Sequence, residues 1–195
     1  MRPRPGASEG GERLGVERGA QAARLRRGDV ADAASVASLN RRVRREALGY
    51  LPELHDAAED LAFFQRVARE SALWLAERDG VLLGFGAARP GWLDHLYVDA
   101  GARGRGIGRS LVERLRRGES EMRLWVFQRN RPAIAFYESL GFRLERETDG
   151  QGNEEREPDA LFVWRRPAAG DGAGDAPISR RRPEGRGAGR PSRAP

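Results

Sequence analysis

The centre of the chain carries its most informative segment, which reads Leu96-Tyr97-Val98-Asp99-Ala100-Gly101-Ala102-Arg103-Gly104-Arg105-Gly106-Ile107-Gly108-Arg109. An apolar strand runs into a turn rich in glycine and arginine, and an amphipathic helix leaves that turn. Glycine lets a ligand approach the backbone closely, and the first turn of a helix has unpaired N–H groups at the positive end of its dipole. The segment therefore predicts an anion-binding site, where arginine can grip a phosphate through two hydrogen bonds.

Two common phosphate-binding motifs do not fit this turn. A P-loop needs a lysine after its second glycine, and the chain contains no lysine. The dinucleotide fingerprint G-x-G-x-x-G needs a glycine where Arg109 stands, and it belongs to an early parallel βαβ unit, whereas this turn lies in mid-chain. The pattern that remains is R-x-x-G-x-G, formed by Arg103, Gly106 and Gly108.

Apolar periodicity and turn residues divide the chain into strands and helices in the order β-α-α-β-β-β-α-β-α-β-β. This order is neither strictly alternating nor segregated, so it predicts an α/β (α+β) fold, a mixed sheet with helices on both faces. Asp32 is the expected N-cap of the first helix, and Asp79-Gly80 is a hairpin signal. We expect helices over 32–48, 57–70, 106–117 and 132–140, and strands over 22–26, 72–77, 81–89, 92–99, 122–127, 142–147 and 160–164.

The composition predicts one soluble globular domain over residues 21–167. Of the 195 residues, 39% are hydrophobic and 33% are charged. Residues 1–20 and 168–195 lack periodic apolar positions, so we expect two disordered tails. Half of the net charge of +6 lies in the second tail, so we do not expect a nucleic-acid partner. No apolar run approaches the roughly 20 residues of a membrane span, no signal peptide is visible, and we expect a cytoplasmic location.

The chain has no cysteine, which excludes disulfides, cysteine-ligated zinc and thiol nucleophiles. His55 and His95 are the two histidines, and no ligand cluster surrounds them in the sequence, so we expect no metal cofactor. An acyl-serine route is excluded too, because the chain lacks a G-x-S-x-G elbow.

A second segment lies further along the chain and reads Phe127-Gln128-Arg129-Asn130-Arg131-Pro132-Ala133-Ile134-Ala135-Phe136-Tyr137-Glu138-Ser139-Leu140-Gly141-Phe142. In this order and spacing, the two segments resemble the two signatures of the GNAT superfamily of N-acetyltransferases, and the resemblance covers about residues 21–166. It implies a GNAT fold with a mixed, mostly antiparallel central sheet of six to seven strands. It also implies acetyl-CoA as cosubstrate and an amine acceptor, with direct acetyl transfer in a ternary complex.

The resemblance assigns cofactor-binding roles around the glycine-rich turn. It implies a central strand splayed by a bulge, whose open backbone groups pair with the pantetheine arm. The Val98 N–H would then stabilise the oxyanion of the acetyl carbonyl. Asn130 would contact the cofactor arm, and it can also serve as a helix N-cap. The implied cofactor-binding set is Leu96, Tyr97, Val98, Arg103, Gly104, Arg105, Gly106, Ile107, Gly108, Arg109, Asn130 and Tyr137.

The resemblance also implies that Tyr137 protonates the departing CoA thiolate, and the alternative is a packing residue beside Phe136. The general base stays open between Asp94, His95, His55 and water. Asp94 and His95 are adjacent on a strand, so we expect their side chains on opposite faces of the sheet. His55 lies between the first two helices, where acceptor pockets of such enzymes often lie, and its pKa class suits a base near neutral pH.

Two further segments, 48–55 and 149–159, resemble acceptor-side parts of a group of largely uncharacterised GNAT proteins. The acids of the second segment either attract a cationic amine or form a solvated hairpin loop, and we favour the solvated loop.

The leading hypothesis is an N-acetyltransferase acting on a small-molecule or peptide amine. The alternative is a non-catalytic regulatory module that binds acetyl-CoA, and a third class would act on nucleic acid through the arginine-rich tail. Dimers are common in the family that the chain resembles.

Overall fold

The computed structural model describes residues 23–167, so both tails expected from the sequence lie outside the described residues. The strands and helices follow the predicted order, and two short 3-10 turns precede α1 and α3. The strands are β1 (Arg24–Arg27), β2 (Ala72–Arg78), β3 (Val81–Arg89), β4 (Trp92–Val98), β5 (Glu121–Phe127), β6 (Arg143–Thr148) and β7 (Asp159–Arg165). The helices are α1 (Ala33–Ala47), α2 (Ala57–Glu70), α3 (Ile107–Leu115) and α4 (Arg131–Ser139).

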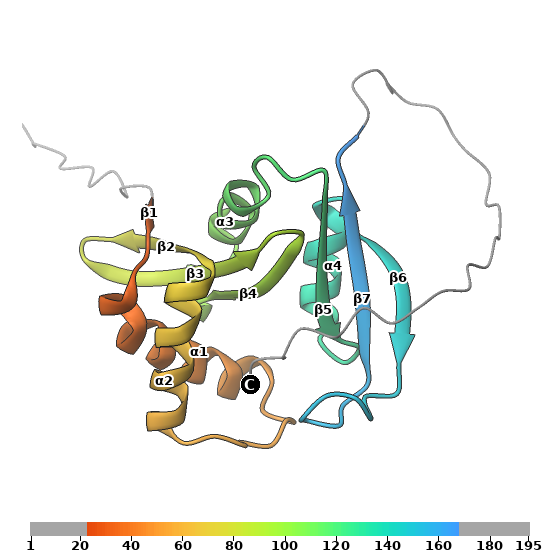
Figure 1. Cartoon of the computed structure of the whole chain (residues 1–195), viewed down its shortest axis with the longest axis horizontal. Coiled ribbons are helices and arrows are strands. Elements are labelled where there is room, and N and C mark those ends of the chain that lie inside the picture. The colour runs from red at the N-terminus through yellow and green to blue at the C-terminus, as the bar shows by residue number, and fades with distance from the viewer. Residues whose placement is uncertain (1–22, 168–195) are drawn as a thin grey trace, which may run out of the picture.

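Seven strands form one sheet in the order β1-β2-β3-β4-β5-β7-β6 (Figure 1). Neighbouring strands are antiparallel except for β4 and β5, which are parallel. The β2–β3 turn has φ angles of 52° at Asp79 and 76° at Gly80, as a type I′ hairpin turn requires. The predicted mixed, mostly antiparallel sheet is confirmed.

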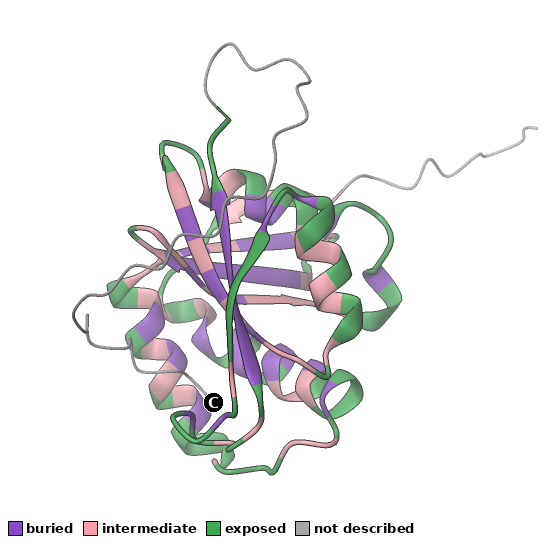
Figure 2. Ribbon diagram, turned by 90° about the vertical axis from the view of Figure 1, so that its right-hand side faces the viewer, coloured by how far each residue is buried: buried purple, intermediate pink, exposed green. Residues whose placement is uncertain are grey.

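Helices cover both faces of the sheet. The helices α1 and α2 pack on β2 and β3 through residues such as Val36, Phe64 and Phe85. The helices α3 and α4 lie on the other face, where Val112 and Leu124 belong to the core. Buried residues follow the strands and the helix sides that face them (Figure 2). Each fully buried Leu or Phe contributes roughly 1.5–3 kcal/mol, so this packing fixes the sheet that carries the site.

The start of α1 differs from the prediction that Asp32 caps it. Asp29 caps the preceding 3-10 turn by accepting a hydrogen bond from the Ala31 N–H at 2.8 Å. The Asp32 side chain makes no capping hydrogen bond to α1. Its carboxylate instead accepts hydrogen bonds from the Asp29 N–H at 2.9 Å and from the Arg26 guanidinium at 2.6 Å. An ion pair between β1 and the helix start has therefore replaced the expected local cap.

The strands β4 and β5 diverge from one another. Within residues 23–167, a single residue pair, Trp92 with Arg123, joins them. A bulge interrupts β4 close to this point, because Ala87 pairs with His95 and Ala88 pairs with Leu93, which leaves an extra residue between the two. The result is a gap in the middle of the sheet that opens toward the carboxyl ends of β4 and β5.

Candidate active site

The bulge in β4 brings two adjacent side chains to the same face of the sheet. Leu93 and Leu96 pack into the core on the α3 and α4 face. Asp94 and His95, which lie between them, both line a cavity on the α1 and α2 face. The prediction that Asp94 and His95 face opposite sides is therefore wrong, because the extra residue interrupts the alternation of a regular strand.

Divergence of the strands leaves backbone groups of β4 directed into the gap. The Asp99 N–H donates to the Leu83 carbonyl of the β3 side at 2.9 Å. N–H groups of successive residues point to alternate edges of a strand. The N–H groups of Val98 and Leu96 therefore point away from β3, toward the gap between β4 and β5.

The turn after β4 exposes its backbone. Gly104 and Gly106 have φ angles of 74° and 79°, and a Cβ at either position would meet no atom within 4 Å. Gly106 is the N-cap of α3, and no side chain caps this helix. The first backbone hydrogen bond of α3 runs from the Ser110 N–H to the Gly106 carbonyl at 3.0 Å. The N–H groups of residues 107–109 precede that bond, so they are placed to bind an anion.

Side chains around this turn divide into two groups. Arg103, Arg105 and Arg109 are exposed and supply positive charge. Ile107 is buried in the core, so only its backbone can face a ligand. Gly108 has a packing role, because a Cβ there would lie 3.1 Å from the Phe136 ring. Glycine at this position therefore lets the start of α3 approach α4.

Asn130 caps α4. Its Oδ1 accepts a hydrogen bond from the Ala133 N–H at 3.3 Å, and Pro132 lies in the first turn, where its missing N–H costs nothing. The capping role that the sequence allowed is confirmed. The cap uses the amide oxygen and leaves the amide NH₂ group as a hydrogen-bond donor, so contact with a cofactor stays a prediction.

Tyr137 lies on α4 beside the gap. Its ring packs edge-on against Phe136 and Phe142, with centroids 5.3 Å and 5.7 Å away. Burial, together with the nearby Tyr97 phenol, raises the pKa of Tyr137 above its usual value. Its hydroxyl is therefore protonated at neutral pH, as a proton donor requires.

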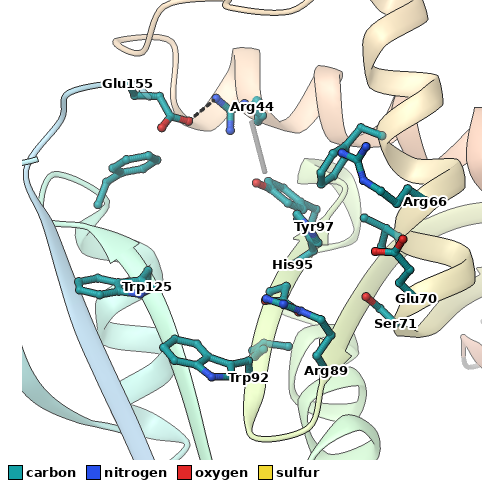
Figure 3. Close-up of a pocket in the computed structure, with 15 residues that line it drawn as sticks. Arg44, Arg66, Glu70, Ser71, Arg89, Trp92, His95, Tyr97, Trp125 and Glu155 are labelled. Atoms are coloured by element: carbon teal, nitrogen blue, oxygen red, sulfur yellow. Dashed lines mark hydrogen bonds and ion pairs between the residues drawn. The ribbon is translucent and has the colours of Figure 1, made fainter. Parts of the chain in front are cut away.

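A cavity of about 200 Å³ lies beside the gap, on the face that α1 and α2 cover. Trp125 of β5 lies across an open space from His95 and Tyr97 of β4 (Figure 3). Trp92, at the point where β4 and β5 meet, and Phe127 also line the cavity. Aromatic rings from both diverging strands thus form its walls.

Charged side chains in the cavity wall are paired with one another. The Arg89 guanidinium holds the Asp94 carboxylate through two hydrogen bonds of 2.8 Å and 2.9 Å. The Arg44 guanidinium lies 3.2 Å from the Glu155 carboxylate, whose side chain is 2% exposed. The Arg44–Glu155 pair closes one end of the cavity (Figure 3). Asp94 is therefore engaged by an arginine, whereas His95 is not.

His95 is a buried, neutral histidine. Its ring packs edge-on against the rings of Phe63 and Phe64, with centroids 5.5 Å and 5.6 Å away. Desolvation lowers the pKa of His95 to about 4, and the charge of Asp94 opposes this shift only in part. At pH 7 the imidazole is therefore uncharged and can accept a hydrogen bond from a group in the cavity.

The segment 149–158 between β6 and β7 is folded on itself. The Asn153 amide donates to the Glu157 carbonyl and to the Asp159 carboxylate, both at 2.8 Å. Gly150 has a φ of 82°, and a Cβ there would lie 2.3 Å from the Glu157 backbone. The segment is a hairpin loop, as expected, since it joins the antiparallel strands β6 and β7, and most of its residues are exposed. It is not solvated throughout, because Asn153 and the Glu155 side chain are buried.

Side chains join this segment to the loop 48–56 between α1 and α2, beside which it lies in Figure 1. The His55 Nε2 atom lies 3.3 Å from the Glu154 carboxylate. The loop 48–56 has a further contact through Tyr50, since the Arg129 guanidinium lies 4.2 Å from the centre of the Tyr50 ring. His55 lines a second cavity of about 260 Å³, next to α1, rather than the aromatic cavity. Arg44 lines both cavities.

Sequence reasoning missed Arg44, Arg89 and Glu155 as site residues. One signal was available for Arg44. It follows Val36 and Asn40 at intervals of four, so it continues the buried face of α1. Arg89 and Glu155 carry no comparable signal, because their placement depends on strand pairing and on a loop fold.

Within residues 23–167, no group of three His, Asp or Glu side chains is arranged to hold a metal ion. No helix in the same range is both long and apolar enough to cross a membrane.

Residues 69–144 match the family model of the acetyltransferase (GNAT) domain. The peptidyl-lysine N-acetyltransferase YiaC of Escherichia coli K12 is 39% identical over 72 residues, which are 36% of this chain and 49% of that protein. The mycothiol acetyltransferase of Thermomonospora curvata is 44% identical over 82 residues, covering 37% of this chain and 28% of that one. The chain thus spans about half or less of the length of these curated relatives.

Solved structures share the fold over most of the described chain. The apo form of YjaB from Escherichia coli superposes with a TM-score of 0.62 at 22% identity, covering 73% of this chain and 97% of that one. The yncA protein of Salmonella typhimurium, solved with its cofactor acetyl-CoA, gives 0.59 at 21% identity, covering 78% and 100%. The family model thus matches the central part of the chain, and the fold of the described residues is that of these solved acetyltransferase structures.

Proposed function

We propose that the protein is an acetyl-CoA-dependent N-acetyltransferase that moves the acetyl group directly to a primary amine of a small molecule or a peptide. The observation that carries this proposal is the gap between β4 and β5. An anion-binding turn, two β4 N–H groups, a neutral tyrosine and an aromatic cavity all border it. The match of residues 69–144 to the family model of the acetyltransferase (GNAT) domain supports the same activity.

The residues around the gap fit acetyl-CoA. The open turn at Gly104 and Gly106 has room for a pyrophosphate, with three helix N–H groups and three arginines to hold it. The backbone of Leu96 and Val98 would pair with the amides of the pantetheine arm, and the Asn130 amide would donate to the same arm. When bound, the cosubstrate supplies an activated acetyl group as a thioester.

Val98 and Tyr137 have complementary tasks in the transfer. The Val98 N–H donates to the acetyl oxygen as it gains negative charge, a contribution typically of about 2.7–4 kcal/mol to the barrier. The lone pair of the neutral amine forms the new C–N bond, and the C–S bond breaks with its electron pair on sulfur. Tyr137 gives its proton to that sulfur. The amine nitrogen loses its surplus proton, and water carries that proton back to the Tyr137 oxygen. The products are the N-acetyl amine and the free thiol of CoA.

His95 is the best placed of the three candidate bases. It lines the cavity and is uncharged at pH 7, so it can accept a hydrogen bond from the amine and orient its lone pair. Its low pKa means that it passes the proton on to water rather than keeping it. Asp94 is held by Arg89, and His55 lies in the neighbouring cavity.

Calorimetry and a rate measurement test this proposal together. Acetyl-CoA should bind with a low-micromolar Kd, about −7 to −8 kcal/mol. Tyr137→Phe should lower turnover about a hundredfold, as expected for loss of a general acid, and leave the affinity for acetyl-CoA unchanged. The chain has no cysteine, so a thiol reagent reports released CoA alone.

Tyr50→Phe, which removes a hydroxyl outside the gap, is the matched control and should keep the rate. No heat with acetyl-CoA would remove the cosubstrate assignment. Binding without turnover of any amine would identify a non-catalytic module. The cytoplasmic location and a homodimer stay predictions, to be checked by fractionation and by light scattering.

A further inference from the structure

We infer that the acetyl acceptor is a hydrophobic monoamine, a primary amine carried next to an aromatic ring, whose ring lies in the cavity between Trp125 and Tyr97. The inference rests on the proposed function and names its substrate class. The cavity walls, their charges and the size of the cavity carry it.

The walls of the cavity are suited to a flat apolar group. Trp125 lies on β5 and Trp92 lies where β4 and β5 meet. His95 and Tyr97 of β4 lie on the opposite side of the cavity (Figure 3). Aromatic rings attract one another in stacked or edge-on arrangements, and their faces attract a cationic amine. A ligand with a ring and a single ammonium group satisfies both kinds of contact.

The charges in the wall argue against a polycation. Three arginines and three acids line the cavity, so its net charge is zero; they are Arg44, Arg66, Arg89, Glu70, Asp94 and Glu155. Two arginine–acid pairs are joined directly, Arg89 with Asp94 and Arg44 with Glu155. A polyamine or an aminoglycoside brings several positive charges, and this cavity has no excess of carboxylates to meet them.

Glu70 is the acid that remains for a single ammonium group. It is exposed at the last turn of α2, and its charge acts on the nearby Arg89 guanidinium, whose pKa it helps to raise, but the described residues hold its carboxylate by no hydrogen bond or direct ion pair. The carboxyl end of a helix also favours a positive charge. Glu70 therefore meets the amine as an ammonium ion at the cavity edge, before the aromatic walls desolvate it and favour its neutral, reactive form.

The size of the cavity suits a small ring. Its space of about 200 Å³ has room for one aromatic ring with a short amine arm. The cavity also opens to solvent, so a longer chain attached to that amine can extend out of it. Such an amine exists as a free arylalkylamine and as the first residue of a peptide that begins with an aromatic side chain.

A panel of four acceptors tests the inference by thiol release: 2-phenylethylamine, the peptide Phe-Gly-Gly, ethylamine and spermidine. We expect kcat/KM for one of the two aromatic acceptors to exceed those for ethylamine and spermidine at least about tenfold, which one good aromatic contact provides. The better of the two aromatic acceptors shows whether the natural acceptor is a free arylalkylamine or the first residue of a peptide. Equal or better use of spermidine or ethylamine would overturn the inference and leave the transferase function standing.

Two variants assign the preference to this cavity. Trp125→Leu should raise KM for 2-phenylethylamine about tenfold, and this rise should be several times larger than any change in the KM for ethylamine. Trp74→Phe is its control, because Trp74 lies outside the cavity, against Arg114. Glu70→Gln should raise KM for both amines, whereas Glu46→Gln, a change at an exposed acid outside both cavities, should raise neither. An equal effect of Trp125→Leu on both amines would contradict the proposed ring site.

Tryptophan fluorescence separates this inference from the proposed function. Two of the four tryptophans line the cavity, so 2-phenylethylamine should quench the emission saturably in the presence of CoA, and Trp125→Leu should reduce the change. Saturable quenching without thiol release from any amine would reject the transferase and support the amine site. Absence of saturable quenching would reject the amine site, whatever the rates show.

Discussion

The turn after β4 lies on the proposed cosubstrate side and the two joined loops at 48–56 and 149–158 lie on the proposed acceptor side, and the two regions are built in different ways. The turn is made by backbone, with glycine at positive φ and exposed arginines. The loops are held by side chains far apart in the sequence, such as Arg44 with Glu155 and His55 with Glu154, which are 111 and 99 positions apart. A site made of backbone groups keeps its ligand specificity when surface side chains are mutated. A site made of side-chain pairs changes its ligand specificity when those side chains are mutated.

The largest effect is expected where the acceptor-side loop depends on one backbone position. Gly150→Ala should destabilise the fold by about 4 kcal/mol, because its Cβ collides with the Glu157 backbone and cannot move aside. Urea unfolding measures this change. Gly152→Ala, an exposed neighbour without positive φ, should be nearly neutral. Equal stabilities of the two variants would show that the fold does not depend on the close approach of Gly150 to the Glu157 backbone.

The turn should respond in ligand affinity rather than in stability. Gly106→Val places a branched side chain in front of the free N–H groups of α3, so the affinity for CoA should fall at least about a hundredfold, or about 2.7 kcal/mol. Gly118→Val is a close match, since Gly118 also has a positive φ and open surroundings, at the other end of α3. Calorimetry should show normal affinity for Gly118→Val. A similar loss of CoA affinity in Gly106→Val and Gly118→Val would assign the effect to backbone strain rather than to a blocked anion site.

An intermediate effect should come from His95 through pH. The unfolded pKa of histidine is about 6.5, and in the folded protein the pKa of His95 is lowered to about 4. Between these values the unfolded chain binds more protons, so stability falls as the pH falls. From pH 7 to pH 5 the loss should be about 2 kcal/mol.

Urea unfolding at the two pH values should show a smaller difference for His95→Gln than for the parent protein. His55→Gln is the control, because His55 lies in the loop 48–56, outside the cluster of Phe63 and Phe64 rings that buries His95. An unchanged pH dependence in His95→Gln would mean that His95 does not avoid protonation in the fold.

The smallest effect is expected for His55→Gln on catalysis. His55 lines the second cavity and contacts Glu154 at 3.3 Å, so its loss should remove an exposed pair worth roughly 0.2–1 kcal/mol. The turnover number should stay within about twofold, as expected when the lost pair lies outside the reacting groups. A tenfold drop in turnover would instead bring His55 into the reaction.

Local signals were enough to predict most of the fold. The helix 57–70 and the strand 81–89 have the predicted bounds, because each begins and ends at clear turn or capping residues. The glycines of the R-x-x-G-x-G turn and the Asn130 cap were also visible, since their roles depend on neighbours within a few positions. Asp32 failed as a cap because Arg26, on a different element, binds its carboxylate.

Features that depend on distant partners were not predictable in the same way. The β4 bulge follows from how β3 pairs with β4, so the common orientation of Asp94 and His95 was not visible in the strand alone. The loop 149–158 contains many charges, and charge alone favours a solvated loop. Its fold depends on the buried network of Asn153 with Asp159 and on the Arg44 pair, neither of which leaves a periodic pattern.

Arg44 is a wall residue of both the aromatic cavity and the second cavity. Replacing it by alanine, together with Glu155→Gln to avoid a stranded carboxylate, would join the two spaces into one longer chamber. The length of acceptor that this fold admits is then set by two side chains, and a change of substrate range needs no rebuilding of the sheet or of the turn that receives the cosubstrate.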